Sequence, residues 1–451
     1  MTLRQFNNAS KRRYVLKPTP LHLRVLSIQG NPLWGFIVLV WMSGAMLIFL
    51  TLYSNYKLDK AFIGSYFIKL SLSNIFEVAL FDLLLLLMTC LSFLFQKAIY
   101  KGYIPQKVTS LIQRVYEAAF VMYSNWYIYK ADWNWTSSGA LCLHSISLLC
   151  KIHSYNTINR RLYEQKRLLE DIKASTKKTD LNESAQIEDI ESVLSIEVPY
   201  NIEYSDHTNT PVLDTTEKLI VTYPDNVTFL NFFEYLVFPT LVYDIAYPRM
   251  KSIRWWFVIE KILEFIGSTF ALYVIIENYI IPYFQNTNNS FIDLLVMTSG
   301  PFMICILLVF NIIFEIICNV CAELSFYADR NFYSDFWNST NYLEFNRKWN
   351  KPVHNFLFRH VYLETVHVMG LHKNVARIFT FFLSSVFHEL VFIVVYKEFK
   401  WYMFIIQMLQ IPLIALQELP QIKRYPIAGN IFFWFGLYCG VPLLCISYNK
   451  F

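Results

Sequence analysis

The chain has 451 residues, of which 55% are hydrophobic, 18% aromatic and only 16% charged. A soluble domain carries about 25% charged residues, so this composition, with its apolar residues in long blocks, excludes an ordinary soluble domain and indicates an integral membrane protein. The formal net charge of +5 is not gathered into a basic face with readout elements, so we expect a lipid bilayer and no nucleic acid as partner.

Residues 1–33 precede the first apolar block and carry basic but no acidic side chains. The basic residues are Arg4, Lys11, Arg12, Arg13, Lys17 and Arg24. The block that follows is too long for the apolar part of a cleavable signal peptide. We therefore expect a short cytosolic N-terminal segment, followed by a helix that stays in the membrane.

Nine stretches qualify as candidate transmembrane helices, each of which needs about 20 mostly apolar residues. In chain order they are 34–53, 76–95, 112–129, 135–150, 255–282, 291–321, 376–396, 400–417 and 428–447. We expect an all-α polytopic membrane protein with about nine transmembrane helices and further interfacial helices. Four spans lie within 34–150, and five lie within a core at 255–451.

The region 151–254 is expected to be a cytosolic loop. Within it, residues 164–218 hold thirteen Asp or Glu and six Lys or Arg, a net of −7, and no Gly. We interpret this stretch as a mobile linker. The one CxxC of the chain, Cys318 and Cys321, lacks the second ligand pair of a zinc site, so no metal is predicted.

His388 stands out because it lies in an apolar stretch, 379–396, in which only His388 and Glu389 can ionise. An ionisable group at membrane depth is costly and usually marks a site. Ser384 and Ser385 lie four and three residues earlier, on the same helix face. A histidine that only forms a hydrogen bond to a neighbouring helix is the alternative interpretation of this pattern.

His388 and Glu389 also invite comparison with the zinc-binding HExxH motif. Position 392 is Phe, so the second metal ligand is absent and a zinc hydrolase is not expected. A neutral imidazole near pH 7 can instead remove a proton from a hydroxyl as that hydroxyl attacks. We therefore predict that His388 is a general base.

A second concentration of polar and aromatic residues covers 323–362. It is too polar to span a bilayer, and its Trp and Tyr residues are typical of the membrane interface. Pro352 disfavours helix at Lys351 and suits the first turn of a new helix. Asn350 would then lie just outside a helix start, with its amide free to point at a ligand. An interfacial helix that only packs explains the composition equally well.

Several motifs occur in fixed order along the chain. Residues 332–338 read Phe-Tyr-Ser-Asp-Phe-Trp-Asn, residues 347–354 fit RxWNxxVH, and residues 151–155 fit KxHSY. Together with residues 238–249 and His388, they resemble the membrane-bound O-acyltransferases. The closer likeness is to the branch of sterol O-acyltransferases and related diacylglycerol acyltransferases, and within it to the sterol enzymes of budding yeasts. Phe stands at position 336, where the FYxDWWN motif of that branch has its first Trp.

This resemblance implies a helical fold around a membrane-embedded reaction chamber, which acyl-CoA enters from the cytosol and a sterol from the bilayer. It implies His388 and Asn350 as the catalytic pair. It also makes a further set of side chains candidates for contacting the CoA or the acyl chain, because basic members could pair with phosphates. That set is Tyr333, Trp337, Asn338, Arg347, His354, Tyr362, Lys373 and Ser384.

We therefore expect an enzyme of the endoplasmic reticulum that transfers a long-chain acyl group from acyl-CoA to the 3-hydroxyl of an ergosterol-type sterol. Acyl-CoA is a co-substrate, and no cofactor is expected. A homo-oligomer, either a dimer or a tetramer, is expected by the same resemblance. Diacylglycerol acyltransferase is the nearest alternative, since it uses the same donor and base. A transporter would not explain His388 together with the aromatic stretch at 332–354.

Overall fold

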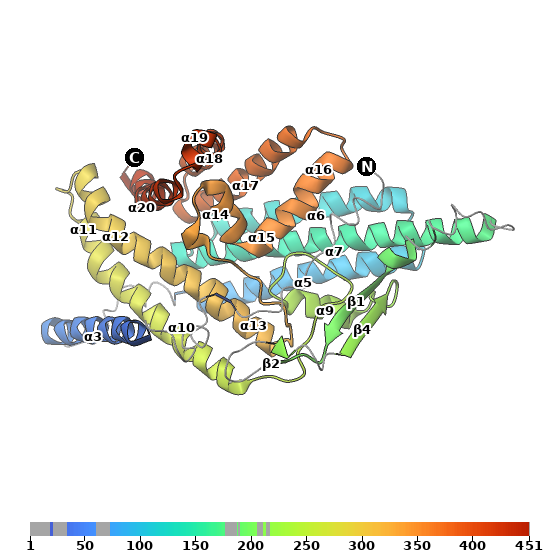
Figure 1. Ribbon diagram of the computed structural model, residues 1–451, viewed down its shortest axis with the longest axis horizontal. Helices are drawn as coiled ribbons and strands as arrows, with labels where there is room; N and C mark the ends of the chain where they lie inside the picture. Colours follow the sequence, from blue (N-terminus) through green and yellow to red (C-terminus); the bar gives the residue numbers. More distant parts are fainter. Residues whose placement is uncertain are drawn as a thin grey trace.

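The computed structural model describes residues 19–20, 34–59, 73–175, 187, 190–204, 211–212 and 217–450. The segment predicted at 1–33 therefore lies mostly outside the described residues. Within the described part the protein is mainly helical, as predicted, with α10 and α12 side by side and α5, α6 and α7 forming a neighbouring group (Figure 1).

All nine stretches predicted to cross the membrane contain helix. The long helices are α3 (Trp34–Asp59), α5 (Ile75–Tyr100), α6 (Gln106–Lys130), α7 (Trp135–Ser175), α10 (Trp255–Ile275), α12 (Phe291–Phe310), α17 (Lys373–Tyr396), α18 (Tyr402–Gln417) and α20 (Pro426–Lys450). Among the described residues, four helical stretches are long and apolar enough to cross a membrane, namely Ile75–Tyr100, Phe291–Leu324, Lys373–Tyr396 and Pro426–Tyr448. The count of about nine crossings stays a prediction.

Shorter elements connect the long helices and carry most of the polar stretch at 323–362. They are α9 (Phe229–Val237), η2 (Ile276–Ile280), α11 (Ile281–Gln285), η3 (Asn311–Ile317), α13 (Cys318–Leu324), η4 (Phe336–Asn338), α14 (Tyr342–Lys348), α15 (Lys351–Phe356), η5 (Leu357–Tyr362), α16 (Leu363–His367) and α19 (Pro420–Lys423). Three of them, η2, η3 and η5, are π-helical and continue α10, α12 and α15 without a break. Such turns occur frequently at functional sites.

The prediction that residues 164–218 form a mobile linker is wrong for the part of this stretch that the structure describes, most of which is helix or strand; residues 176–186, 188–189, 205–210 and 213–216 lie outside the described residues. Helix α7 continues to Ser175, because neither Gly nor Pro interrupts it after residue 151. Further along, short strands form two antiparallel pairs, β1 (Ser195–Tyr200) with β4 (Glu217–Thr222) and β2 (Glu203–Tyr204) with β3 (Pro211–Val212). The acidic composition gave no strand signal. Val198 is buried, but most of the other strand residues are not, so no apolar alternation marks the strands.

Two clusters of buried side chains make up most of the core. One lies among α5, α6, α7 and the C-terminal half of α17, and it includes Phe81, Phe120 and Val394. The other joins α7 to α9, to α12 and to the aromatic motif 332–338, and it includes Tyr155 and Phe310. Helix α7 contributes to both clusters, so it links the helix that carries His388 to the segment that leads to Asn350.

Candidate active site

Helix α17 carries the strongest catalytic candidate, His388. The helix begins at Lys373 and is held near its C-terminal end by Glu389, whose side chain is buried. The Glu389 carboxylate accepts hydrogen bonds of 2.9 Å from the backbone N–H groups of Trp401 and Phe404, at the start of α18. Glu389 therefore anchors α17 to the start of α18.

A hydrogen bond within its own helix fixes which nitrogen of the neutral His388 ring carries the hydrogen. Nδ1 lies 2.8 Å from the carbonyl oxygen of Ser384, one turn earlier. A carbonyl can only accept, so in the neutral ring Nδ1 carries the hydrogen and Nε2 keeps its lone pair. Among the described residues, Nε2 makes no hydrogen bond. Ser384, predicted to contact a substrate, thus acts on the histidine through its backbone.

His388 is exposed. Its position around helix α17 differs from that of the exposed apolar side chains. Phe382 and Val386, both exposed, lie six and two residues earlier. With about 100° of rotation per residue, Val386 is on roughly the opposite side of the helix from His388, and Phe382 is about a third of a turn away. The exposed apolar side chains suit lipid, whereas His388 faces the side of Ser384.

Asn350 occupies the position predicted from Pro352. It is the N-cap of α15, and its Oδ1 accepts a hydrogen bond of 3.1 Å from the backbone N–H of Val353. Side-chain caps of this kind stabilise a helix start. The cap uses the amide oxygen only, and in the described part of the chain Nδ2 has no recorded partner. Asn350 can therefore donate a hydrogen bond to a ligand while it still caps the helix.

The aromatic motif clamps the segment that ends at Asn350. The backbone N–H of Ser334 donates to the carbonyl of Lys348 at 2.9 Å, and the N–H of Lys351 donates to the carbonyl of Phe332 at 3.0 Å. These two bonds lie on either side of Asn350 along the chain. Any displacement of the motif would therefore displace Asn350.

The helix that starts after Asn350 presents a row of rings. His354 stacks on Phe358 with ring centroids 6.4 Å apart, and Phe358 stacks on Tyr362 at 5.7 Å. Phe358 is 40% exposed, so this row is open on one side. The π-helical turn η5 packs against α17 (Figure 1). Two predicted ligand-contacting residues, His354 and Tyr362, are thus brought to one face of the same helix.

Basic side chains gather where this helix begins. Burial, followed by the positive charges of Arg347 and Lys351, lowers the pKa of His354. The positive charges of Arg347 and Lys351 therefore disfavour a further positive charge on His354. Arg347 is exposed, and Lys373 is exposed at the first turn of α17. The arrangement suits a phosphate group better than a neutral ligand.

The remaining predicted ligand-contacting residues lie in the motif itself. Tyr333 is only 2% exposed, and its hydroxyl donates to the carboxylate of Glu315 at 2.7 Å. The carbonyl of Trp337 accepts a hydrogen bond of 2.9 Å from Nδ2 of Asn430. Asn338 is exposed. Tyr333 and Trp337 thus have contacts of their own within the protein, through which they stabilise the motif.

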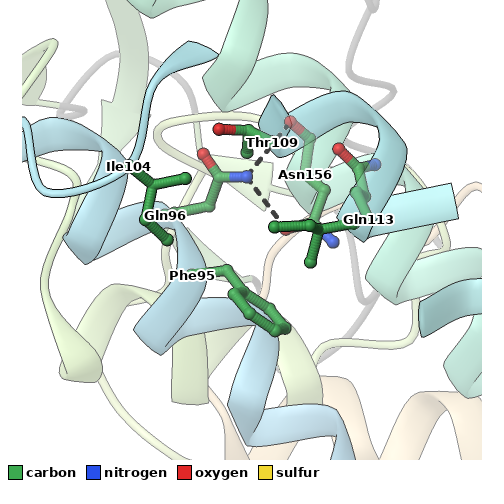
Figure 2. Close-up of a pocket in the computed structure, with 7 residues that line it drawn as sticks. Phe95, Gln96, Ile104, Thr109, Gln113 and Asn156 are labelled. Carbon is green, nitrogen blue, oxygen red and sulfur yellow. Dashed lines mark hydrogen bonds between the residues drawn. The ribbon is translucent and has the colours of Figure 1, made fainter. Parts of the chain in front are cut away.

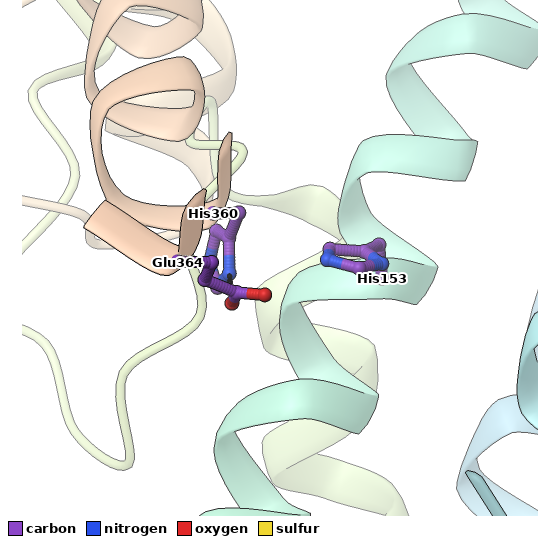
Figure 3. Close-up of side chains that lie close together, drawn as sticks. All are labelled: His153, His360 and Glu364. Carbon is purple, nitrogen blue, oxygen red and sulfur yellow. Dashed lines mark ion pairs between the residues drawn. The ribbon is translucent and has the colours of Figure 1, made fainter. Parts of the chain in front are cut away.

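A polar cluster that sequence analysis did not select joins α7 to η5 and α16 (Figure 3). Nε2 of His360 lies 2.8 Å from Oγ of Ser154, and Nδ1 lies 3.4 Å from Oε1 of Glu364. Nearby, Nδ1 of His153 lies 2.9 Å from Oε2 of Glu117. Two separate signals were present, the KxHSY motif that contains His153 and Ser154 and the spacing of His360 and Glu364 by one helical turn. Nothing joined them, because the two segments are far apart in sequence.

The donor types of this cluster could hold a metal ion. His153, His360 and Glu364 offer three ligand atoms within 4.8 Å of one another. However, Glu364 already pairs with Arg161 at 2.9 Å, so an ion would face a guanidinium group. The absence of a metal site stays a prediction, and this pair is the physical argument in its favour.

Two pockets lie away from these residues. Figure 2 shows a small one between α5, α6 and α7, where Nε2 of Gln96 donates to Oδ1 of Asn156 at 3.0 Å. The other lies beside the C-terminal end of α6 and is lined by Trp126 and Trp133, among others. Neither is lined by a predicted site residue. The reaction chamber implied by the sequence resemblance therefore remains a prediction.

Comparisons with known proteins agree with the motifs. Residues 119–449 match the family described as MBOAT, the membrane-bound O-acyltransferase family. The chain is 33% identical to a probable sterol O-acyltransferase 2 of Schizosaccharomyces pombe, over 99% of this chain and 93% of that protein. It is 32% identical to a sterol O-acyltransferase 2 of Candida albicans, over 93% and 75%. It is 35% identical to a diacylglycerol O-acyltransferase 1C of Glycine max, over 51% and 46%.

Proposed function

Because the chain belongs to the membrane-bound O-acyltransferase family and is an acyltransferase, we propose that it esterifies the 3-hydroxyl of an ergosterol-type sterol with a long-chain acyl group from acyl-CoA. Two relatives that match most of this chain are named as sterol enzymes. The observation that carries the chemistry is the hydrogen bond from Nδ1 of His388 to the Ser384 carbonyl. It leaves Nε2 as a base.

In the proposed reaction, Nε2 of His388 takes the proton from the sterol hydroxyl as the oxygen attacks the thioester carbonyl. A C–O bond forms, and the carbonyl becomes an oxyanion. The C–S bond then breaks, and the imidazolium returns the proton to the departing CoA thiolate. The products are a steryl ester and CoA, with no net change in protons.

Asn350 is the proposed donor to the oxyanion. Its Oδ1 is used by the helix cap, while Nδ2 is available and held in a fixed direction by that cap. A preorganised donor of this kind contributes about 10²–10³-fold to the rate. Asn350 and His388 lie on two segments that pack together, since η5 of the Asn350 helix contacts α17.

The basic group near Asn350 supports acyl-CoA as the donor. Burial, followed by the positive charges of Arg347 and Lys351, lowers the pKa of His354, and charge-assisted contacts to phosphate are strong. The open row of His354, Phe358 and Tyr362 offers an apolar and aromatic face beside these charges. Such a surface suits a molecule with a charged head and a long chain.

Diacylglycerol is the second candidate acceptor, favoured by the relative from Glycine max. An acceptor assay separates the two. The purified protein is incubated with labelled acyl-CoA and with ergosterol, cholesterol or diacylglycerol, and the labelled ester is identified. We expect steryl ester with ergosterol. Triacylglycerol as the sole product would overturn the proposed acceptor, but not the base.

The base is tested separately by His388→Ala. We expect the loss of about 10²–10⁴-fold in rate that follows removal of a general base, with unchanged thermal unfolding. His144→Ala is the matched control, because His144 also lies on a long helix, where its Nδ1 contacts Asp82 at 2.5 Å. That control should keep its activity. Wild-type activity in the His388 variant would disprove the assignment.

We also place the protein in the endoplasmic reticulum membrane, with a cytosolic N-terminus, as a homo-oligomer. The basic residues Lys97, Lys101 and Lys107 support this orientation, because they cluster where α5 ends and α6 begins. Lys423 and Arg424 lie between α18 and α20. Protease protection of tagged termini in microsomes tests the orientation, and native electrophoresis in mild detergent tests the oligomer.

A further inference from the structure

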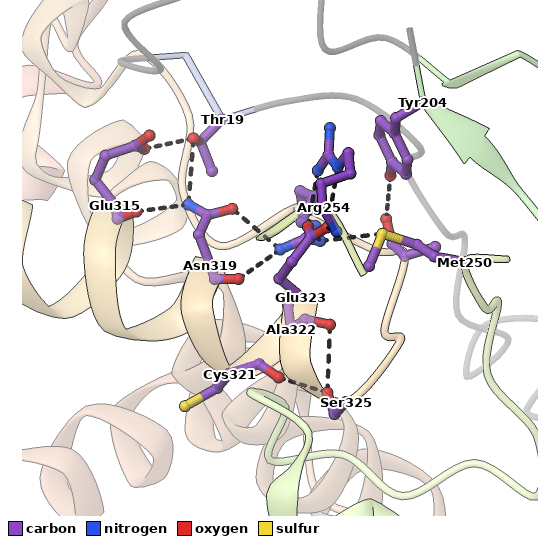
Figure 4. Close-up of polar contacts among 12 residues, drawn as sticks. Thr19, Tyr204, Met250, Arg254, Glu315, Asn319, Cys321, Ala322, Glu323 and Ser325 are labelled. Atoms are coloured by element: carbon purple, nitrogen blue, oxygen red, sulfur yellow. Dashed lines mark hydrogen bonds and ion pairs between the residues drawn. The ribbon is translucent and has the colours of Figure 1, made fainter. Parts of the chain in front are cut away.

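A threonine that precedes the first long helix is buried against a charged network. Thr19 is 1% exposed, and its hydroxyl donates to Oε2 of Glu315 in η3. Nδ2 of Asn319 lies 3.5 Å from the same hydroxyl (Figure 4). A polar side chain from near the start of the chain thus contacts two residues of the long helical stretch Phe291–Leu324.

Glu315 is the centre of this network. It is 1% exposed, and its Oε1 accepts a hydrogen bond of 3.0 Å from Nζ of Lys261. Its Oε2 accepts two bonds, one from Thr19 and one of 2.7 Å from the hydroxyl of Tyr333. A buried carboxylate is costly unless it is fully paired. Thr19 is therefore one of three donors that hold Glu315, and it shares an oxygen with Tyr333.

Tyr333 connects this network to the proposed site. Its backbone lies between Phe332 and Ser334, whose carbonyl and N–H make the two bonds that hold Lys351 and Lys348. Those bonds flank Asn350. Thr19 is therefore connected to Asn350 through an oxygen of Glu315, through Tyr333 and through two backbone hydrogen bonds.

We propose that Thr19 is a positioning residue for the acyl transfer, which acts through Glu315 and Tyr333 on Asn350. The proposal rests on the role assigned to Asn350 above. Thr19 itself is then coupled to the proposed site, although it lies outside the region 119–449 that matches the family. Loss of its hydroxyl leaves Oε2 of Glu315 with Tyr333 alone and lets the motif shift.

The test is Thr19→Val, which keeps the shape and removes the hydroxyl. We expect kcat to fall by about five-fold to a hundred-fold. The upper value is the most that the loss of one hydrogen bond to a charged group would cost. KM for acyl-CoA is measured alongside, but kcat carries the test, because the shift reaches Asn350 through the backbone of Lys351, which is also part of the basic group. Thr19→Ser restores the hydroxyl and should restore kcat.

Thr298→Val is the matched control. Thr298 is buried in the same long helical stretch, but its hydroxyl bonds to the carbonyl of Leu294 within its own helix at 2.7 Å. This variant should keep kcat. Thermal unfolding of all variants is measured in parallel, so that a general loss of folded protein is recognised.

A double variant distinguishes positioning from mere packing. If Thr19 acts through Tyr333, the effect of Thr19→Val on kcat should largely disappear in a Tyr333→Phe background. Independent effects that multiply, or wild-type kcat in Thr19→Val, would overturn the proposal. The kcat values of the variants are compared for whichever ester the wild type forms. If the sterol assignment is wrong, the wild type forms a different product, and that result is independent of the Thr19 test.

Discussion

The hydroxyl of Tyr448 in α20 donates a hydrogen bond of 2.9 Å to Oε1 of Glu389, the residue that follows His388. The same carboxylate accepts the backbone N–H groups of Trp401 and Phe404. Three segments of the chain thus meet on one side chain. The position of the proposed base therefore depends on the contacts of the carboxylate beside it.

Glu389→Gln tests this dependence. Glutamine has one acceptor oxygen, and its NH₂ group cannot accept from an N–H, so at least one of the three donors loses its partner. A bond to a charged group contributes about 1.5–3 kcal/mol. We expect a lower unfolding temperature and a lower kcat, measured in detergent solution.

Glu398→Gln is the control for the Glu389 variant. Glu398 pairs with Lys400, but its side chain is 54% exposed, and exposed ion pairs contribute about 0–1 kcal/mol. Its unfolding temperature and activity should stay close to wild type. If both variants unfold at the same temperature, Glu389 does not anchor α17.

Asn350 has two roles that substitution can separate. Asn350→Asp keeps the oxygen that caps α15 but removes the Nδ2 donor, while Asn350→Ala removes both. Aspartate caps a helix as well as asparagine does. The Asp variant should therefore be as stable as wild type yet lose about 10²–10³-fold in kcat. The Ala variant should lose about 1 kcal/mol of stability in addition. An active Asp variant would rule out Nδ2 as the oxyanion donor.

Local features of this chain could be predicted well from sequence. The helix start after Asn350 follows from Pro352 and the N-cap rule, and the structure confirms it. The nine apolar stretches all contain helix, because a long run of apolar residues without Gly or Pro clusters has few alternatives. The proximity of His388 to Ser384 likewise follows from helical spacing. The hydrogen bond joins Nδ1 of His388 to the backbone carbonyl of Ser384, not to its hydroxyl.

Contacts between distant segments could not be predicted. Thr19 meets Glu315 across 296 residues, and Ser154 meets His360 across 206. A single sequence contains no periodic signal for such pairs, since each residue type is common on a polar helix face. The strands within 164–218 were missed for a related reason, because their pairing buries few apolar side chains and leaves an acidic composition.

Metal removal tests the cluster of His153, His360 and Glu364. Arg161 occupies the carboxylate of Glu364 at 2.9 Å, and Ser154 occupies Nε2 of His360 at 2.8 Å. A divalent cation would have to displace or face the guanidinium group. We expect purified protein to contain no stoichiometric zinc by elemental analysis, and dialysis against EDTA to leave the rate unchanged. Zinc at one per chain, lost together with activity, would contradict this expectation.

The same cluster predicts how stability varies with pH. Burial lowers the pKa of His360 to about 3, against the opposing effect of the Glu364 contact and with a further contribution from His153 and Arg359. The unfolded histidine has a pKa of about 6.5. Below pH 6.5 the unfolded chain therefore binds a proton that the folded chain does not, so stability is fully present above that pH and falls as the pH falls toward 3.

His360→Gln removes this dependence, since glutamine can occupy the same place without titrating. From pH 7.5 to 5.5, one unit below the unfolded pKa, the wild type should lose about 1.4 kcal/mol that the variant does not lose. The pKa of His153 is raised: burial would lower it, but the hydrogen bond to Glu117 and the charge of that carboxylate outweigh burial. The opposite slope that this produces is present in both proteins and cancels in the difference. Equal losses of unfolding free energy over this range would show that His360 is not held neutral in the folded protein.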